Sequence, residues 1–145
     1  MYKTIEINKR SWRVGKFDAR TGSKIIKKLL PIVSTFFDSN AKKADDIKID
    51  IVSVISAINT LTDADFDFIQ GESLKISSEL LKSGYVPVMN YDGSYGVIDI
   101  EFDTMLVLTL TAHALIHNVT GFFIGSPLAS IVDKAMSTFQ PTTQT

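Results

Sequence analysis

The sequence contains no cysteine and only two histidines among its 145 residues. The absence of cysteine excludes a disulfide framework, a thiolate zinc site and a cysteine nucleophile, and it fits a reducing compartment. Long apolar runs are also missing, because the longest one, at 105–116, has twelve residues. A membrane-spanning helix needs about 20, so we expect a core helix there and no membrane partner. The first ten residues lack the apolar segment that marks a secretory signal.

Motifs that would support catalysis or cofactor binding are missing as well. The tripeptide at 22–24 has the wrong order and spacing for a phosphate loop. His113 and His117 lie four residues apart, but no Glu follows the first of them, as it does in a zinc protease. The acidic run at 63–67 lacks the Gly and Glu that a calcium loop needs at its sixth and twelfth positions. We therefore expect no catalytic residue, no metal site and no cofactor.

Charge is balanced in total but uneven along the chain. The hydrophobic share of 45% and the charged share of 21% are ordinary for a globular protein, and the net charge is −1. Residues 1–30 hold nine Lys and Arg against two acidic residues, a net charge of +7. Residues 31–145 hold six Lys against fourteen acidic residues, a net charge of −8. Such asymmetry indicates an electrostatic contact, either with a partner or between the two parts of the chain.

The N-terminal segment predicts a β-hairpin followed by a basic helix. Residues 2–8 alternate in polarity, and a second short run at 11–17 follows after a polar turn, which is typical of two paired strands. Asp18 is a suitable N-cap for a helix that begins near Ala19, and Pro31 ends or kinks that helix. The apolar stripe of this helix consists of Ile25, Ile26, Leu29 and Leu30, and the other face carries Lys24, Lys27 and Lys28.

Helical periodicity dominates the remainder of the chain. We expect further helices over 32–37, 47–61, 63–70, 73–82, 102–118 and 127–139. Gly71 interrupts the helical pattern, Gly84 ends the helix over 73–82, and the helix over 102–118 begins near Asp103 and ends near Gly121. Residues 85–100 predict a loop with at most a short hairpin.

These elements predict a mainly α (α+β) fold in which an N-terminal β-hairpin packs on a small bundle of about five or six helices. We expect a single helical domain over 1–139, with the hairpin at about 1–17, and a polar C-terminal tail at 140–145.

The basic helix after Asp18 allows three interpretations. The plainest is a solvated helix face, and the second is contact with a protein partner. Binding of nucleic acid or anionic lipid is the third. It is disfavoured because the isoelectric point is near 6.1 and because, beyond Trp12 and Phe17, no aromatic residues are interleaved with the basic ones.

The order of the segments carries a family resemblance. A hairpin with an aromatic residue (TIEINKRSWRVGKFDA) leads through small residues into a basic amphipathic helix (ARTGSKIIKKLLPIV). Weakly patterned helices follow, and a long apolar helix then runs into Asn and paired aromatics (LTAHALIHNVTGFF). Over most of its length the chain resembles the tail assembly chaperones of long-tailed bacteriophages.

The resemblance implies a small, non-enzymatic, mostly helical protein made late in infection in the host cytoplasm and absent from the mature virion. Such chaperones hold the tape-measure protein soluble until tail-tube subunits polymerise around it. In many members a ribosomal frameshift yields a longer form whose extra domain recruits tube protein, and this chain, ending in FQPTTQT, would be the shorter form. A homo-oligomer is one open option.

Shielding the apolar helical faces of a tape-measure protein calls for shallow apolar surfaces with charged rims. The candidates for the apolar part are Phe36, Phe37, Phe122 and Phe123, and Asn118 precedes the last two in the quoted motif. Lys24, Lys27 and Lys28 are the candidates for the rim. Ordinary core packing is the alternative for each phenylalanine.

Two other functions stay open from the sequence. One is a structural minor tail or tail-completion protein that is retained in the virion. The other is a small nucleic-acid-binding regulator that uses the basic N-terminal helix.

Overall fold

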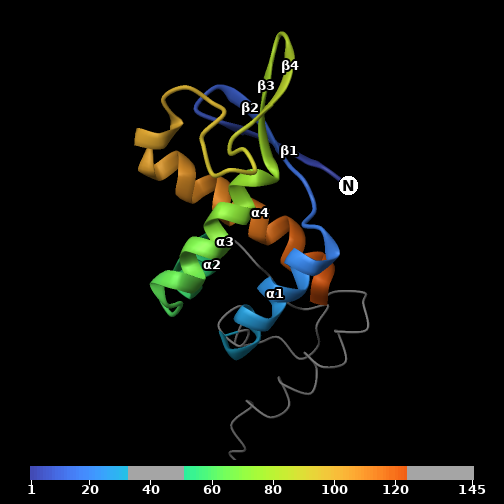
Figure 1. The fold of residues 1–145 in the computed structure, drawn as a ribbon, viewed down its shortest axis with the longest axis vertical. Helices are drawn as coiled ribbons and strands as arrows, with labels where there is room; N and C mark the ends of the chain where they lie inside the picture. Colours follow the sequence, from blue (N-terminus) through green and yellow to red (C-terminus); the bar gives the residue numbers. More distant parts are fainter. Residues whose placement is uncertain (33–50, 124–145) are drawn as a thin grey trace, which may run out of the picture.

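The computed structural model describes residues 1–32 and 51–123, which form a small antiparallel sheet and a group of helices (Figure 1). The strands are β1 (Lys3–Ile7), β2 (Arg10–Val14), β3 (Ser77–Leu81) and β4 (Gly84–Pro87). The helices are α1 (Ala19–Leu29), α2 (Ile51–Ile58), α3 (Asp63–Lys75), the short 3-10 helix η3 (Ile100–Phe102) and α4 (Thr104–Phe123).

The four strands lie in the order β1-β2-β3-β4, and all neighbours are antiparallel. Asn8 and Lys9 both have positive φ, which is the backbone of the tight turns that match the twist of a two-stranded hairpin. The predicted N-terminal hairpin is thus confirmed. The register places Trp12 of β2 opposite Ile5 of β1 and Glu79 of β3. The inward face of the sheet is therefore built from residues far apart in the sequence.

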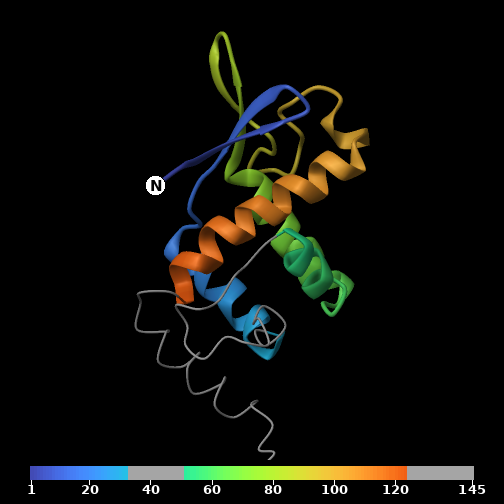
Figure 2. The ribbon, with the colours of Figure 1, turned by 180° about the vertical axis from the view of Figure 1, so that it is seen from behind.

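Helix α4 crosses the molecule diagonally below the sheet, as the two opposite views show (Figures 1 and 2). Helices α2 and α3 contact it, and α1 lies near its C-terminal end. By length and composition alone, Thr104–Phe122 would be apolar enough to cross a membrane. Its packing is that of a core helix, because Leu106, Leu110 and Leu115 are buried against the other elements.

The buried apolar side chains form two clusters that α4 joins. The first lies between the helices and consists of Phe17, Ile25, Leu29, Val54, Ala57, Ile69, Ala112, Leu115 and Val119. The second lies under the sheet and consists of Trp12, Leu74, Val88, Val97, Ile100, Leu106 and Leu110. The N-terminal half of α4 thus supports the sheet, and its C-terminal half packs against α1 and α2.

The prediction of a hairpin on a bundle of about five or six helices is wrong. The described residues contain four α-helices and a four-stranded antiparallel sheet, so the fold is α+β. The helix predicted over 73–82 accounts for much of the difference. Its first residues end α3, and its later residues form β3, whose buried positions alternate from Ser77 to Glu79. Gly84, expected to end a helix, has a φ of 122° and is the first residue of β4, directly after the turn from β3.

Other predicted boundaries also move. Helix α3 runs through Gly71 without interruption, and α4 continues through Gly121 to Phe123. The helix predicted over 47–61 appears as α2 within the described residues. The predicted helices over 32–37 and 127–139 and the tail at 140–145 lie, apart from Ile32, outside the described residues. The single domain over 1–139 stays a prediction.

Candidate protein-binding surface

Helix α1 begins where the sequence predicts it, and this start fixes the direction of its basic face. The Asp18 side chain accepts hydrogen bonds from the backbone N–H and the hydroxyl of Thr21, at 2.9 and 2.7 Å. These bonds hold the pKa of the Asp18 carboxyl below its usual value. Ile25 and Leu29 are buried on the inner face of the helix, Lys24 and Lys27 are exposed, and Lys28 is half-buried.

The three lysines surround a shallow hollow between α1 and α3. Its lining residues are Lys24, Lys27, Lys28, Pro31, Asp65 and Phe68, and its volume is about 410 Å³. We call it the α1–α3 hollow. Its lining combines two apolar residues, Phe68 and Pro31, with four charged ones.

One of the three lysines is already engaged within the chain. The Lys28 ammonium lies 2.7 Å from the Asp65 carboxylate and 5.3 Å from the centre of the Phe68 ring. The hydrogen bond from Lys28 lowers the pKa of Asp65 below its ordinary value. Asp65 is itself fixed by the start of α3, because its backbone N–H donates to the Thr62 hydroxyl. Lys28 therefore joins α1 to α3 rather than reaching outward.

Lys24 and Lys27 differ from Lys28 because both are exposed and neither forms an ion pair with another described residue. With three lysines and one aspartate, the α1–α3 hollow carries a net charge of about +2. Such a surface fits an apolar side chain flanked by acidic residues.

Asn118 lies elsewhere, buried at the junction between α4 and the segment that links β2 to α1. Its amide oxygen accepts from the backbone N–H of Phe17 at 3.0 Å. Its amide nitrogen donates to the carbonyls of Gly15 and Ala114, at 3.0 and 2.9 Å. Lys16 adds a bond to the carbonyl of His117 at 2.7 Å. Asn118 thus holds the linker against α4, and its part in partner binding stays a prediction.

The phenylalanines predicted as partner contacts are not brought together with the lysines by the described residues. Phe122 is half-buried and packs against the helical cluster, and a side chain added at Gly22 would meet its ring at 3.4 Å. Phe36, Phe37 and the side chain of Phe123 lie outside the described part of the structure. The hollow instead uses Phe68, which sequence reasoning missed. The acidic start of α3 opposite a basic helix was the signal that could have pointed to it.

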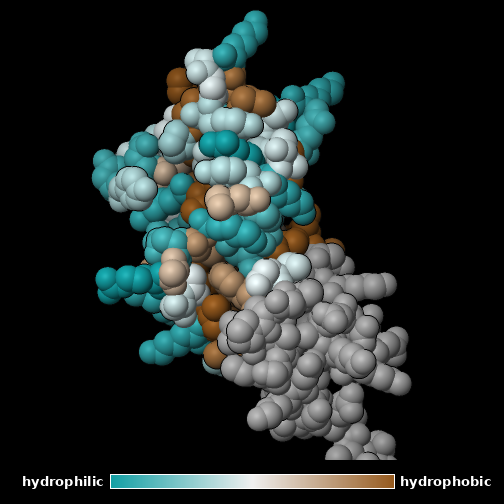
Figure 3. Space-filling view, turned by 90° about the vertical axis from the view of Figure 1, so that its right-hand side faces the viewer, coloured by the Kyte–Doolittle hydropathy of each residue, from teal (hydrophilic) through white to brown (hydrophobic). Residues whose placement is uncertain are grey.

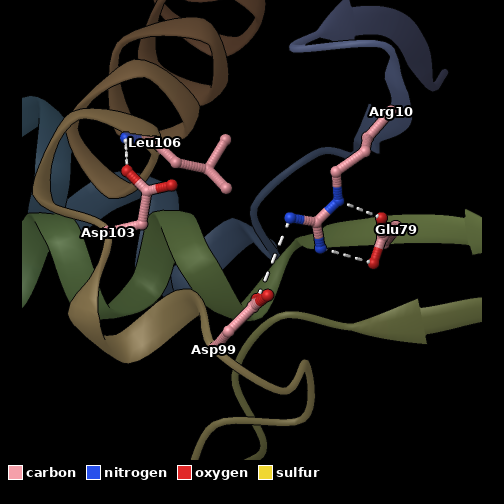
Figure 4. A network of polar contacts seen from close by, with 5 residues as sticks. All are labelled: Arg10, Glu79, Asp99, Asp103 and Leu106. Atoms are coloured by element: carbon pink, nitrogen blue, oxygen red, sulfur yellow. Dashed lines mark hydrogen bonds and ion pairs between the residues drawn. The ribbon is translucent and has the colours of Figure 1, made fainter.

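A second polar network fixes the other end of the molecule, at the start of α4 (Figure 4). Arg10 donates two hydrogen bonds to the buried Glu79 carboxylate, at 2.6 and 3.0 Å, and its guanidinium also lies 3.8 Å from Asp99. Its bonds to Glu79 raise the pKa of Arg10. Asp103 accepts from the backbone N–H of Leu106 at 3.1 Å and so caps α4. This network ties β2 and β3 to the loop before α4.

His113 and His117 both lie on α4, close to the N-terminus of the chain. The ring of His117 is 2.7 Å from the carbonyl of Met1, and burial lowers the pKa values of both His113 and His117, with Lys3 contributing in each case. Over residues 1–32 and 51–123, no group of three or more metal-ligating side chains comes together.

Comparison with known protein families gives a match over most of the chain. A family described as "Phage tail assembly chaperone protein, TAC" matches residues 8–130, which is most of the chain. No curated protein and no solved structure matches it. The match begins after β1 and spans β2, α1, the α1–α3 hollow and all of α4. The resemblance drawn from the order of the segments is confirmed, and the chain belongs to the phage tail assembly chaperone family.

Proposed function

We propose that this chain binds the tape-measure protein and keeps it soluble until the tail tube polymerises, without catalysing a reaction. Membership of the family gives the chain a role in phage tail assembly. The α1–α3 hollow is the observation that supports the finer proposal, because its lining combines apolar residues with an excess of lysines.

The hollow suits a helical partner that must later be released. A partner helix places one or two apolar side chains against Phe68 and Pro31 and directs acidic residues toward Lys24 and Lys27. Contacts of this size are weak one at a time, so many of them along a long chain shield it while each remains displaceable. On the side shown in Figure 3, exposed apolar side chains lie in separate areas within a mostly hydrophilic described surface. This pattern favours local contacts over one long groove.

The proposal extends to where and with what the chain acts. It works in the host cytoplasm and is left out of the mature virion. A longer frameshifted form brings the tail-tube protein to the complex. Lys28 and Asp65 neutralise each other within the hollow, which makes the surface less suited to a phosphate backbone than to a protein.

Co-expression with the cognate tape-measure protein tests the proposal. We expect the soluble fraction of that protein to rise several-fold when this chain is present. We expect the double variant Lys24→Glu with Lys27→Glu to lose most of the gain, because acidic residues on the rim repel an acidic partner segment.

A matched control uses the variant Lys9→Glu with Lys82→Glu. These two lysines are also exposed, lie in the turns of the two hairpins, and give the same change of charge. The control variant should protect the tape-measure protein as well as the wild type does. No gain in solubility from the wild type, or recovery of the chain as a stoichiometric component of purified virions, would contradict the proposal.

A further inference from the structure

The sheet packs one face on the core and turns its other face outward. Trp12, Val14 and Glu79 are buried on the inner face, so the residues between them along β2 and β3 point outward. One outward row crosses all four strands and consists of Thr4, Arg13, Ser78 and Pro87. The two ends of this row are exposed, and its two middle members are half-buried. We call this side of the sheet the outer sheet face.

Two aromatic rings and a guanidinium form a stack on the outer sheet face. The guanidinium carbon of Arg13 lies 4.1 Å from the centre of the Tyr2 ring and 3.5 Å from the centre of the Tyr85 ring. Tyr2 is 56% exposed and lies beside Gly15, and Tyr85 is 40% exposed. The exposed Leu80 lies opposite Tyr85 in the register. Planar groups held in this way offer a surface on which a further planar group can stack.

Positive charge surrounds this stack. Arg13 forms no ion pair with an acidic residue in the described part of the chain, and its buried Nε has no hydrogen-bond partner there. Lys9 and Lys82 are exposed and lie in the two hairpin turns. The antiparallel register of β2 and β3 brings both turns to the same end of the sheet. The β3–β4 hairpin also projects beyond the helices in both ribbon views, so this end is accessible (Figures 1 and 2).

The acidic residues of the sheet do not cancel this charge. Residues 3–14 and 77–87 hold five Lys and Arg against two Glu, a net charge of +3, although the whole chain has a net charge of −1. One of the two, Glu79, is already paired with Arg10 at 2.6 Å, which leaves Glu6 as the other. The sheet therefore attracts a negatively charged ligand.

We propose that the outer sheet face binds single-stranded RNA. An unpaired base stacks on the Tyr85 ring, and the guanidinium of Arg13 contacts a neighbouring phosphate. Lys9 and Lys82 hold further phosphates where the strand leaves the sheet. The hydroxyls of Thr4 and Ser78 lie in the outward row on either side of Arg13, where they can bond the ribose 2′-hydroxyl that DNA lacks.

The chemistry of this face favours RNA over a protein partner. Protein interfaces are centred on apolar side chains that become fully buried on binding. The outward row instead combines two hydroxyls, a guanidinium and a proline, and the tyrosine rings beside it are already stacked on a cation. Flat aromatic and basic surfaces of this kind suit bases and phosphates.

This inference is independent of the tape-measure proposal. The outer sheet face is built from the four strands, whereas the α1–α3 hollow is lined by residues of α1 and α3 and by Pro31. A variant of one surface therefore leaves the other intact.

Fluorescence anisotropy with a labelled oligouridylate of about 12 nucleotides tests the inference on the purified full chain. We expect saturable binding that weakens with salt, with a slope of log K against log salt of about −2, because about three phosphate contacts contribute about 0.7 each. Oligodeoxyuridylate of the same length should bind several-fold more weakly. A double-stranded RNA should not compete, since its bases are already stacked in the helix.

Two substitutions at Tyr85 test the stacking. Tyr85→Leu should lower the affinity for the oligouridylate about tenfold, because the leucine side chain has no ring on which a base can stack. Tyr85→Phe should bind as the wild type does, because it keeps the ring. Thermal melting of both variants checks that the sheet is folded.

Two charge variants, each with the same change of charge, test the position of the site. Lys9→Glu with Lys82→Glu should lower the affinity for RNA at least about tenfold and flatten the salt slope, because two phosphate contacts are lost. Lys24→Glu with Lys27→Glu should change it by less than about twofold, because these lysines lie at the hollow. Solubilisation of the tape-measure protein should show the reverse order, so a failure of either proposal is seen separately.

Several results would overturn the inference. These are a wild type that does not bind the oligouridylate, equal affinity for the RNA and DNA probes, or equal weakening by the two charge variants. If the wild type fails to bind RNA and the Lys9→Glu with Lys82→Glu variant also loses protection of the tape-measure protein, the outer sheet face binds protein instead. RNA binding without any protection of the tape-measure protein would leave this inference standing and remove only the other proposal.

Discussion

Asn118 connects the sheet to the helices through three hydrogen bonds made by one buried side chain. Two of them satisfy the backbone of the linker, at the N–H of Phe17 and the carbonyl of Gly15. Neither group belongs to a helix or strand ladder at that point, because the linker lies between β2 and α1. A buried amide that satisfies such groups fixes the local structure more firmly than an apolar side chain of equal size.

We predict that Asn118→Leu destabilises the fold by about 2–6 kcal/mol, because two buried backbone groups lose their partners at about 1–3 kcal/mol each. Urea denaturation followed by circular dichroism measures the change. Thr120→Ala is the control on the same helix, since Thr120 is half-buried but forms no comparable bond with another described residue, and its effect should be small. An Asn118→Leu protein as stable as the wild type would show that water or rearrangement replaces these bonds.

At the residue scale, what the sequence predicts well is local. The sequence predicts Asp18 as the cap of α1, and the structure has it there. Helical spacing also separates Lys24, Lys27 and Lys28 from the fully buried positions of that helix. Phe68 was missed because its place in the hollow depends on how α3 packs against α1. Spacing within one helix contains no information on that packing.

At the element scale, β3 is the strand that local sequence patterns could not predict. Residues 73–82 have a spacing of apolar residues that fits a helix. The strand forms because this segment pairs with β2, where Glu79 lies opposite Trp12. Glu79 also accepts a hydrogen bond from Arg10, which is 69 residues away in the sequence. Such long-range pairing overrides local propensity. The N-terminal hairpin, whose two strands are joined by a short turn, was predicted correctly.

Two glycines, one in a helix and one in a loop, allow a prediction about how each site accepts a side chain. Gly71 lies inside α3, and a side chain added there meets nothing within 4 Å. Gly96 follows the turn after β4, and an added Cβ would lie 2.2 Å from the carbonyl oxygen of Pro87. We predict that Gly71→Ala stabilises the protein by about 0.5–1 kcal/mol, because alanine reduces the freedom of the unfolded chain.

Gly96→Ala should destabilise the protein by more than about 1 kcal/mol, because backbone must move to admit the methyl group. Both variants replace glycine with alanine, so a difference between their melting temperatures reports the effect of position alone. Equal shifts of the melting temperature in the same direction would contradict this account of the loop between β4 and α4.

At the scale of the whole molecule, the uneven charge is organised into two surfaces of opposite sign. Lys24 and Lys27 line the α1–α3 hollow, and the exposed Asp99 and Glu101 lie just before the start of α4. The net charge of −1 for the whole chain gives no indication of this arrangement. The asymmetry along the sequence pointed to an electrostatic contact, but the position of each surface required the fold.

This arrangement predicts how salt acts on partner binding. Raising the salt concentration from about 0.1 M to about 1 M shortens the screening length from about 10 Å to about 3 Å and weakens attraction between exposed charges. We expect capture of the tape-measure protein by the wild type to fall markedly over this range, because Lys24 and Lys27 are exposed.

The variant Lys24→Gln with Lys27→Gln should bind more weakly at low salt, and its binding should change little on adding salt, since the charges that salt screens are already gone. Binding measured by surface plasmon resonance at several salt concentrations gives both slopes. Equal slopes for the wild type and this variant would place the electrostatic contact elsewhere, and a wild type insensitive to salt would leave the apolar base of the hollow as the source of affinity.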